Sequence, residues 1–517
     1  TRFRNVTGVQ TCALPISGHG LDPFATSTAA EADISLHNAI VKGQQLSDIR
    51  LMASLADGNA HVEATSANRR ADFSLQADGN IAGQTMDWTF ATDVRNIDLR
   101  ALGLTDSVAD GAVALAGRAS FTPAVASTHR KPGHPMRLQA DVDVSHLYWH
   151  MPGDAINADS LRLNFATADS ATTARLTNHD LTIDFWSPEP LDTITKRLGW
   201  TSLALDRDLK RRRLAIDTIQ RAMPRFSLDM RAGADNILTN YLAGRDMSFA
   251  DLRLHARNDS AFSLSTTILG LTSGKTAIDS LNVDMLQRGT YLLYSARMNN
   301  RPGTMDQFAH VEARGYINAD RVSISLSQQN IAGETGYSLG MLAAIHDMTH
   351  LRIQFVPFHP VIGYKDWDIN RDNFIDYDLA TQHIDANLDL HNKVSSLQLF
   401  TEHNHADSAA NDVVLRVKDI KLDDWLAINP FAPPVSGDLS ADMKISWLKP
   451  DLNGTGTVSL HNFNYGKQKV GDFDLALDLT TNAAGTLRAT TSLMVDGHKA
   501  ITASGNLNDS TAANPFL

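Results

Sequence analysis

One polar loop of the sequence has the residue spacing of a calcium-binding turn. Counted from Asp368, oxygen-bearing side chains stand at loop positions 1, 3, 5 and 9, beginning with Asp368, Asn370 and Asp372. A hard cation favours this arrangement because it takes oxygen ligands from alternate residues of a tight turn. Two positions depart from the pattern, because position 6 is Asn373 instead of glycine and position 12 is Leu379 instead of an acid. We therefore predict a solvated polar turn without a metal, with calcium binding as the alternative.

A second group of potential metal ligands consists of His403, His405 and Asp407. In an extended segment the two imidazoles would lie on one face, with the carboxylate as a third ligand. The sequence has no HExxH motif and no zinc-type spacing that supports this interpretation. We predict a solvated loop here and no metal site.

A basic cluster, Lys210-Arg211-Arg212-Arg213, could bind phosphate or anionic lipid headgroups. It falls on a predicted helix, with Asp206 and Asp208 nearby. A solvated helix face is therefore the preferred interpretation.

No combination of residues predicts catalysis. Gly454-Thr455-Gly456 has glycines like those of a phosphate loop, but no helix is predicted to follow it. No serine stands in the strand-to-helix motif of a nucleophile elbow. A catalytic triad assembles through space, but nothing in the sequence favours one. We predict that the protein is not an enzyme and uses no cofactor.

The composition argues against a disordered chain, a nucleic-acid-binding protein and a bilayer-spanning segment. The 517 residues are 43% hydrophobic and 20% charged, which indicates a folded chain. The net charge of −12 and the aromatic content of 7% are unsuited to a nucleic-acid partner. No run of roughly 18 apolar residues occurs, so no segment of this sequence is predicted to span a bilayer.

The candidate ligands and charged residues above must be positioned by secondary-structure elements. The strongest signal for such elements is the alternation of apolar and polar residues along the sequence. The pattern is strict in Leu439–Trp447, Met136–Val144 and Ile384–Leu390. A period of two indicates a β-strand with one apolar and one polar face, which is typical of antiparallel sheets. The sequence therefore predicts a mostly β fold, an antiparallel sheet of repeated meander strands, with more than half of the residues extended.

Turn and helix signals interrupt the strands. Predicted turns are Asp57-Gly58-Asn59, Asp78-Gly79-Asn80 and Lys131-Pro132-Gly133, and a proline-rich break is predicted at Val356–Pro360. A few short helices are predicted at Pro190–Trp200, Asp206–Met223 and Asn236–Ala243. The predicted regions are a first β-repeat region at 18–187, a helix-containing segment at 188–250, and further β-repeat regions at 251–360 and 361–517, the last of them truncated.

Residues 1–17 resemble a translated sequencing adapter, and we set them aside from the fold prediction. They contain Cys12, the only cysteine, so that the rest of the chain offers no disulfide, thiol nucleophile or cysteine-based metal site. The sequence has no initiator methionine and stops directly after an alternating run. We interpret it as an internal fragment of a longer protein.

Three stretches carry a resemblance to a known family: Pro224–Leu242, Val361–Ile375 leading into Asp385–Leu390, and Pro430–Asp442. In these stretches, and in its repeat texture from residue 18 to 517, the chain resembles the AsmA-like envelope proteins, and most closely their TamB-type branch from Bacteroidetes.

The resemblance implies an elongated, curled β-sheet whose apolar groove carries phospholipid acyl chains between the inner and outer membranes. It also implies a periplasmic protein that is anchored in the inner membrane by an N-terminal helix. An outer-membrane barrel-assembly protein would be its partner.

The sequence alone is compatible with this function, because a one-sided sheet must pair, curl or bind lipid to hide its apolar face. Each buried CH₂ of an acyl chain contributes about 0.8 kcal/mol, so an apolar groove binds tails without specific contacts. We predict that the groove lining forms one continuous apolar surface, with polar neighbours such as Asp389 and Asp474 facing water. Its predicted members are Leu138, Val142, Ile384, Leu388, Leu439, Met443, Ile445, Phe473, Leu475 and Leu477.

Two other functions are compatible with a repetitive sheet. A surface-exposed, adhesin-like scaffold would bind ligands through its loops, although repeat spacings of 14 to 20 residues between Gly437 and Gly505 are less regular than solenoids require. A carbohydrate-active enzyme would need paired carboxylates in a cleft.

Overall fold

A computed structural model describes residues 6–507 apart from 10–11, 14–15, 38, 42–43, 83–84, 99–109, 124–135, 152–153, 275, 304–305, 347–348, 382, 404–410, 427–431, 449–450 and 482–486. About 69% of the residues lie in strands and 10% in helices. The strands form a long antiparallel meander that is not closed into a barrel. The predicted mostly β meander is therefore confirmed.

The chain divides into two compact units. Unit 1 comprises residues 1–204 and 218–286, and unit 2 comprises residues 205–217 and 287–517. The predicted segment 188–250 contains the helices α1 (Leu191–Lys210), α2 (Ile216–Ala222) and α3 (Ile237–Ala243). The short helices η1 (Asp306–Phe308) and α4 (Leu422–Leu426) lie in unit 2.

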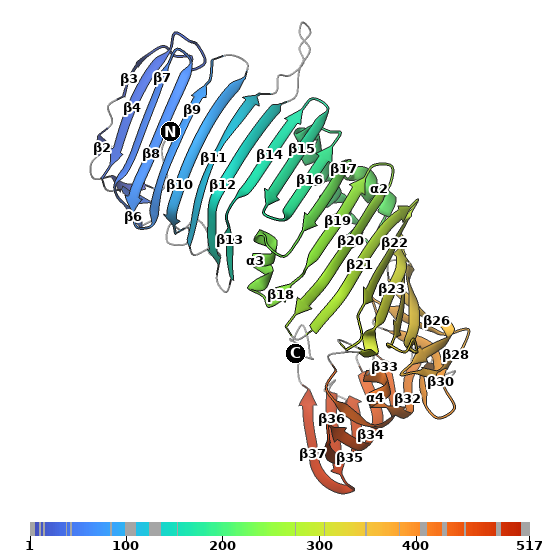
Figure 1. Ribbon diagram of the computed structural model, residues 1–517. Helices are drawn as coiled ribbons and strands as arrows, with labels where there is room; N and C mark the ends of the chain where they lie inside the picture. The colour runs from blue at the N-terminus through green and yellow to red at the C-terminus, as the bar shows by residue number, and fades with distance from the viewer. Residues whose placement is uncertain are drawn as a thin grey trace. The chain divides into compact units, whose positions relative to one another are not determined.

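In unit 1, strands from β3 to β21 pair antiparallel, mostly with the next strand along the chain, as Figure 1 shows. The small strands β1, β5 and β6 form a separate three-stranded sheet. The strands are β1 (Val6–Val9), β2 (Cys12–Ala13), β3 (Ile16–His19), β4 (Ala29–Leu36), β5 (Ala39–Val41), β6 (Gln44–Leu46), β7 (Ile49–Ala56), β8 (Asn59–Asn68), β9 (Ala71–Asn80), β10 (Met86–Ile97), β11 (Asp110–Thr122), β12 (Arg137–Met151), β13 (Asp154–Ala158), β14 (Leu161–Ala168), β15 (Ala171–Asn178), β16 (Leu181–Ser187), β17 (Phe226–Ala232), β18 (Met247–Ser248), β19 (Asp251–Asn258), β20 (Phe262–Ser273) and β21 (Thr276–Arg288).

Unit 2 continues the same antiparallel pattern, with β26 pairing both β25 and β29. Its strands are β22 (Tyr291–Asn299), β23 (His310–Ile317), β24 (Arg321–Gln329), β25 (Thr335–His346), β26 (His350–Ile362), β27 (Lys365–Asp366), β28 (Asp368–Ile369), β29 (Phe374–Asp378), β30 (Ile384–His391), β31 (Ser396–His403), β32 (Asn411–Lys421), β33 (Val435–Leu448), β34 (Asp451–Tyr465), β35 (Gln468–Thr481), β36 (Leu487–Val495) and β37 (His498–Leu507).

The turn predictions have different outcomes. Asp57 and Gly58 join β7 to β8 with φ angles of 51° and 75°, the left-handed conformation that two-residue hairpins favour. The turn predicted at Asp78-Gly79-Asn80 is wrong, because these residues end strand β9. Gly79 lies opposite Trp88, and a Cβ at this position would collide with the indole ring. This glycine therefore makes room for a cross-strand tryptophan. The turn predicted at Lys131–Gly133 lies outside the described residues.

The first two helix predictions are corrected. Helix α1 does not stop at Gly199 but continues to Lys210, because a solvated glycine costs a helix only about 1 kcal/mol. Ile194 and Ala204 are buried on either side of this glycine and hold the helix against the protein. The helix ends just before Arg212, whose φ of 51° is left-handed. Consequently the second helix is only Ile216–Ala222.

The proline-rich segment is also corrected. The predicted break at Val356–Pro360 is a bulge inside β26, because Val356 pairs with Gly340 and Val361 pairs with Ser338. The residues between them leave the hydrogen-bonded ladder, as proline requires, and the strand then continues.

Candidate apolar groove

The register of unit 1 gathers apolar side chains on one face of the sheet. Residues that lie opposite each other in antiparallel strands share a face, so the paired positions can be followed from strand to strand. We call the face that carries this row the apolar face of unit 1, and the opposite one its polar face. The row runs through Ala53, Val62, Ala77, Phe90, Gly117, Val142, Leu163, Leu176, Ile183, Met230, Leu254, Thr266 and Val283.

Two predicted lining residues lie on this apolar face. Val142 pairs with Gly117 on one side and Leu163 on the other, and Leu138 pairs with Phe121 and Thr167. Both side chains are half-buried. They are therefore covered by their neighbours within the sheet, while part of each remains accessible.

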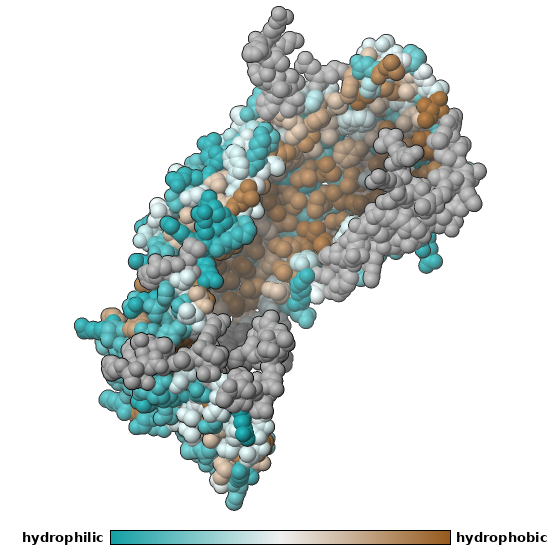
Figure 2. Space-filling model, turned by 180° about the vertical axis from the view of Figure 1, so that it is seen from behind, coloured by the Kyte–Doolittle hydropathy of each residue, from teal (hydrophilic) through white to brown (hydrophobic). Residues whose placement is uncertain are grey.

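The apolar face is open over much of unit 1. Among the described residues from Ala29 to Asn178, no Leu, Ile, Val, Phe, Met or Trp side chain is buried, and the buried apolar residues there are Ala71 and Ala158. Figure 2 shows this face as a hollowed apolar surface. The accessible surface of the chain is 30600 Å², whereas two compact proteins of half its mass would together expose roughly 22,000 Å².

Helix α3 covers a limited part of this face. Leu238 and Leu242 pack against the buried cluster of Leu181, Ala232 and Phe249. The helix is fixed at its start by Asn236, whose side chain accepts hydrogen bonds from the backbone N–H groups of residues 238 and 239 at 3.0 and 3.1 Å. Figure 1 places α3 beside β13 and β18. The sequence predicted this helix but not its position over the apolar face.

The polar face of unit 1 carries ion pairs that link a strand to its neighbouring strand or turn. Arg50 pairs with Asp33 at 2.9 Å, and Arg137 pairs with Asp169 at 2.6 Å. All four side chains are exposed, so water and salt screen these pairs and they add little to stability. These pairs make the polar face a surface suited to water.

The pairing of His179 with Asp159 in unit 1 can be tested by titration. The hydrogen bond from the His179 ring to Asp159, at 2.6 Å, raises the pKa of the imidazole above 6.5 and lowers the pKa of the carboxyl. A raised pKa means that the protonated ring stabilises the fold below about pH 6.5, and that this contribution disappears as the pH rises through the folded-state pKa.

We expect ¹³C-labelled histidine spectra to show His179 titrating above pH 6.5 in the wild type. In Asp159→Asn its pKa should fall, because the partner charge is gone. His179→Gln assigns the signal. Equal titration in the wild type and Asp159→Asn would contradict the pairing.

In unit 2, the eight remaining predicted lining residues share one face of the sheet. Leu388 pairs with Leu399, which pairs with Leu415, which pairs with Met443, and the row then passes through Gly456 to Leu477. The other five residues lie two or four positions from these along the same strands, and therefore on the same face, namely Ile384, Leu439, Ile445, Phe473 and Leu475. The register thus places all eight on one face, while a lining role remains a prediction.

That face is covered by other side chains around Leu388 and accessible to solvent around Leu475. Leu388 is 7% exposed and belongs to a buried cluster with Ile362 and Trp367, against which the side chain of Trp425 packs. The Trp425 ring from α4 meets the Trp367 ring edge-on, with 5.7 Å between ring centroids. Leu475 is 37% exposed on the same face. Leu388 is therefore in a closed core, and Leu475 is on open sheet.

The calcium-like loop is held by one hydrogen bond within the loop and by contacts with the neighbouring strands β30 and β26. The Asn370 amide donates to Asp372 at 3.2 Å, the Asn387 amide donates to Asp372 at 2.9 Å, and the His359 ring contacts Asp368 at 2.7 Å. Among the described residues no group of three His, Cys, Asp or Glu side chains could hold a metal ion. The solvated turn without calcium remains a prediction.

The predictions for the histidine-containing and basic clusters stay untested. The side chains of His403, His405 and Asp407 lie outside the described part of the chain. In the basic cluster, Lys210 pairs with Asp206 at 2.8 Å on the exposed end of α1. In the part of the chain that the structure describes, no helix is both long enough and apolar enough to cross a membrane.

Comparisons with protein-family models, with curated proteins and with solved structures give no match to this chain.

Proposed function

We propose that the chain conducts phospholipid along the apolar face of its sheet, as a section of an envelope protein related to the AsmA-like and TamB-type proteins. The supporting observation is the open apolar face of unit 1, where a run of strands has no buried large apolar side chain among its described residues. A continuous apolar surface of this kind needs a cover, and a chain-like apolar ligand fits a face that extends from strand to strand.

Acyl chains match this face energetically. Each CH₂ removed from water contributes about 0.8 kcal/mol, so a fully covered 16-carbon chain would gain on the order of 10 kcal/mol before entropic costs. The apolar face offers hydrocarbon side chains instead of directed hydrogen bonds, which suits a ligand that slides. In this mechanism the chain is a passive path, and lipid moves down its own gradient.

The cellular setting is part of the proposal. We propose that the full-length protein lies in the periplasm, is anchored in the inner membrane by an N-terminal helix, and acts with an outer-membrane barrel-assembly protein. This setting is supported by the resemblance to the AsmA-like family of Pro224–Leu242, Val361–Ile375 with Asp385–Leu390, and Pro430–Asp442.

Lipid binding by the purified chain tests the proposal. The chain is incubated with vesicles of phosphatidylethanolamine and phosphatidylglycerol, re-isolated by gel filtration and extracted for lipid analysis. We expect several phospholipids per chain, because the open face extends over many strands. Less than one lipid per chain would contradict conduction and would favour an adhesin-like scaffold.

A further inference from the structure

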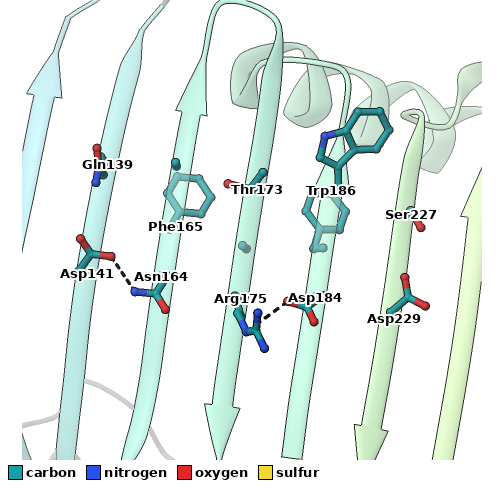
Figure 3. Close-up of a pocket in the computed structure, with 13 residues that line it drawn as sticks. Gln139, Asp141, Asn164, Phe165, Thr173, Arg175, Asp184, Trp186, Ser227 and Asp229 are labelled. Atoms are coloured by element: carbon teal, nitrogen blue, oxygen red, sulfur yellow. Dashed lines mark hydrogen bonds and ion pairs between the residues drawn. The ribbon is translucent and has the colours of Figure 1, made fainter.

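The polar face of unit 1 has a depression of about 420 Å³ over β12, β14, β15, β16 and β17 (Figure 3). The register explains its shape, because one row of paired residues runs from Gln139 through Ala166 and Thr173 to Trp186 and Ser227. The small side chains in the middle of the row form the floor, and the two long ones, Gln139 and Trp186, rise on either side.

A second row of paired side chains lies beside the first, with each member two residues away from a member of the first row on the same strand. In this row Asn164 donates to Asp141 at 2.7 Å, and Arg175 pairs with Asp184 at 3.5 Å, as Figure 3 shows. Asp229 lies at the end of the row and contacts His255 at 2.8 Å. Neighbouring side chains therefore hold these planar polar groups in place beside the depression.

Trp186 adds an apolar platform to this polar surface. The indole is 50% exposed, although it stands on the face of β16 that also carries Asp184. A tryptophan ring offers a flat apolar surface together with an N–H donor. An aromatic platform beside fixed planar hydrogen-bonding groups is suited to a ring with one apolar face and several hydroxyl groups.

We propose that this depression binds a neutral glycan, with one pyranose ring stacked on Trp186 and its hydroxyls bonded to Asn164, Arg175 and Asp184. The charges favour a neutral ligand over an anionic one, because three carboxylates and one guanidinium lie around the depression. A basic peptide is the competing ligand, and the donor or cationic partner that each carboxylate already has makes it less favourable. An ionised carboxylate has lone pairs for further hydroxyl donors.

This proposal is independent of lipid conduction, since it concerns the opposite face of the sheet. The test is isothermal calorimetry of the full chain with three neutral probes: cellohexaose, chitohexaose and mannohexaose. We expect at least one of them to bind with a submillimolar Kd. Trp186→Ala should weaken that binding at least tenfold, and Asp184→Asn should weaken it several-fold while keeping the aromatic platform.

Trp200→Ala is the matched control, because Trp200 is a comparably exposed tryptophan, 57% accessible, on α1 of the same unit. It should bind the glycan like the wild type. Circular dichroism establishes that each variant is folded. Binding of none of the three glycans, glycan affinity that is unchanged in both Trp186→Ala and Asp184→Asn, or binding of hexalysine alone would each overturn the proposal.

Discussion

Val142→Asp is expected to lower phospholipid transfer by roughly 70-fold, measured between donor and acceptor vesicles with the chain as carrier. Valine and aspartate have similar volumes, so the change is chiefly one of charge. An ion that faces hydrocarbon costs at least about 2.5 kcal/mol, which corresponds to this factor. Val142 lies in the row that crosses unit 1, with Gly117 and Leu163 beside it, so a charge there interrupts the apolar path.

Ser145→Asp is the control for this prediction. Ser145 is an exposed residue at the bulge of the same strand, and it takes the same charge without entering the apolar row. We expect Ser145→Asp to transfer lipid within about twofold of the wild type. If both variants lose lipid transfer equally, a charge anywhere on β12 disturbs transfer. If both variants keep wild-type transfer, the apolar face does not conduct the lipid.

Leu388→Arg is expected to destabilise unit 2 by roughly 3–5 kcal/mol, because it places an unpaired charge in the buried cluster around Trp367. This outcome differs from a simple block of the groove, which lipid conduction alone would predict for a charged substitution in the lining. Hydrogen exchange of peptides from β30, β31 and β32 measures the effect, and the amides of these strands should lose protection.

Leu475→Arg makes the same chemical change at an open position of the same face. Because Leu475 is 37% exposed, its arginine can reach water, and we expect a stability change of less than about 1 kcal/mol. Lipid binding, in contrast, should fall in this variant. If both variants lose protection to the same extent, the distinction between closed core and open sheet is wrong.

The strands were predictable because their pattern is local. Alternation in Met136–Val144 and Leu439–Trp447 sets the two faces of a strand before any partner is known, and β12 and β33 confirm both. Strands β8 and β15 have a weaker local signal, since Asn59–Asn68 and Ala171–Asn178 are rich in alanine and threonine and have little polarity contrast. Their pairing with strongly patterned neighbours, such as β9 and β14, makes them strands.

The closed core was not predictable from the same pattern. Leu388 and Leu475 stand in equally regular alternating runs, so the sequence gives both the same expectation. What separates them is Trp425 on α4, which joins the cluster around Leu388 and Trp367. Such a contact depends on how distant segments meet, and alternation along one strand carries no information about it.

The depression on the polar face shows a second limit of sequence reasoning. Trp186 follows Asp184 at the spacing of two that puts both on one face, and this was a usable local signal. The small residues that form the floor, Ala166 and Thr173, come from other strands and are aligned only by the register. None of these positions belongs to a site motif that the sequence shows.

Photo-crosslinking along β12 tests lipid conduction most directly. A benzophenone amino acid is placed at each position from 138 to 144 in turn, and the full chain is irradiated with vesicles of phosphatidylethanolamine and phosphatidylglycerol. We predict phospholipid adducts at 138, 140, 142 and 144, which lie on the apolar face, and none at 139, 141 and 143, which lie on the polar face. Adducts of equal yield at both sets of positions, or at none of them, would contradict lipid conduction along the sheet.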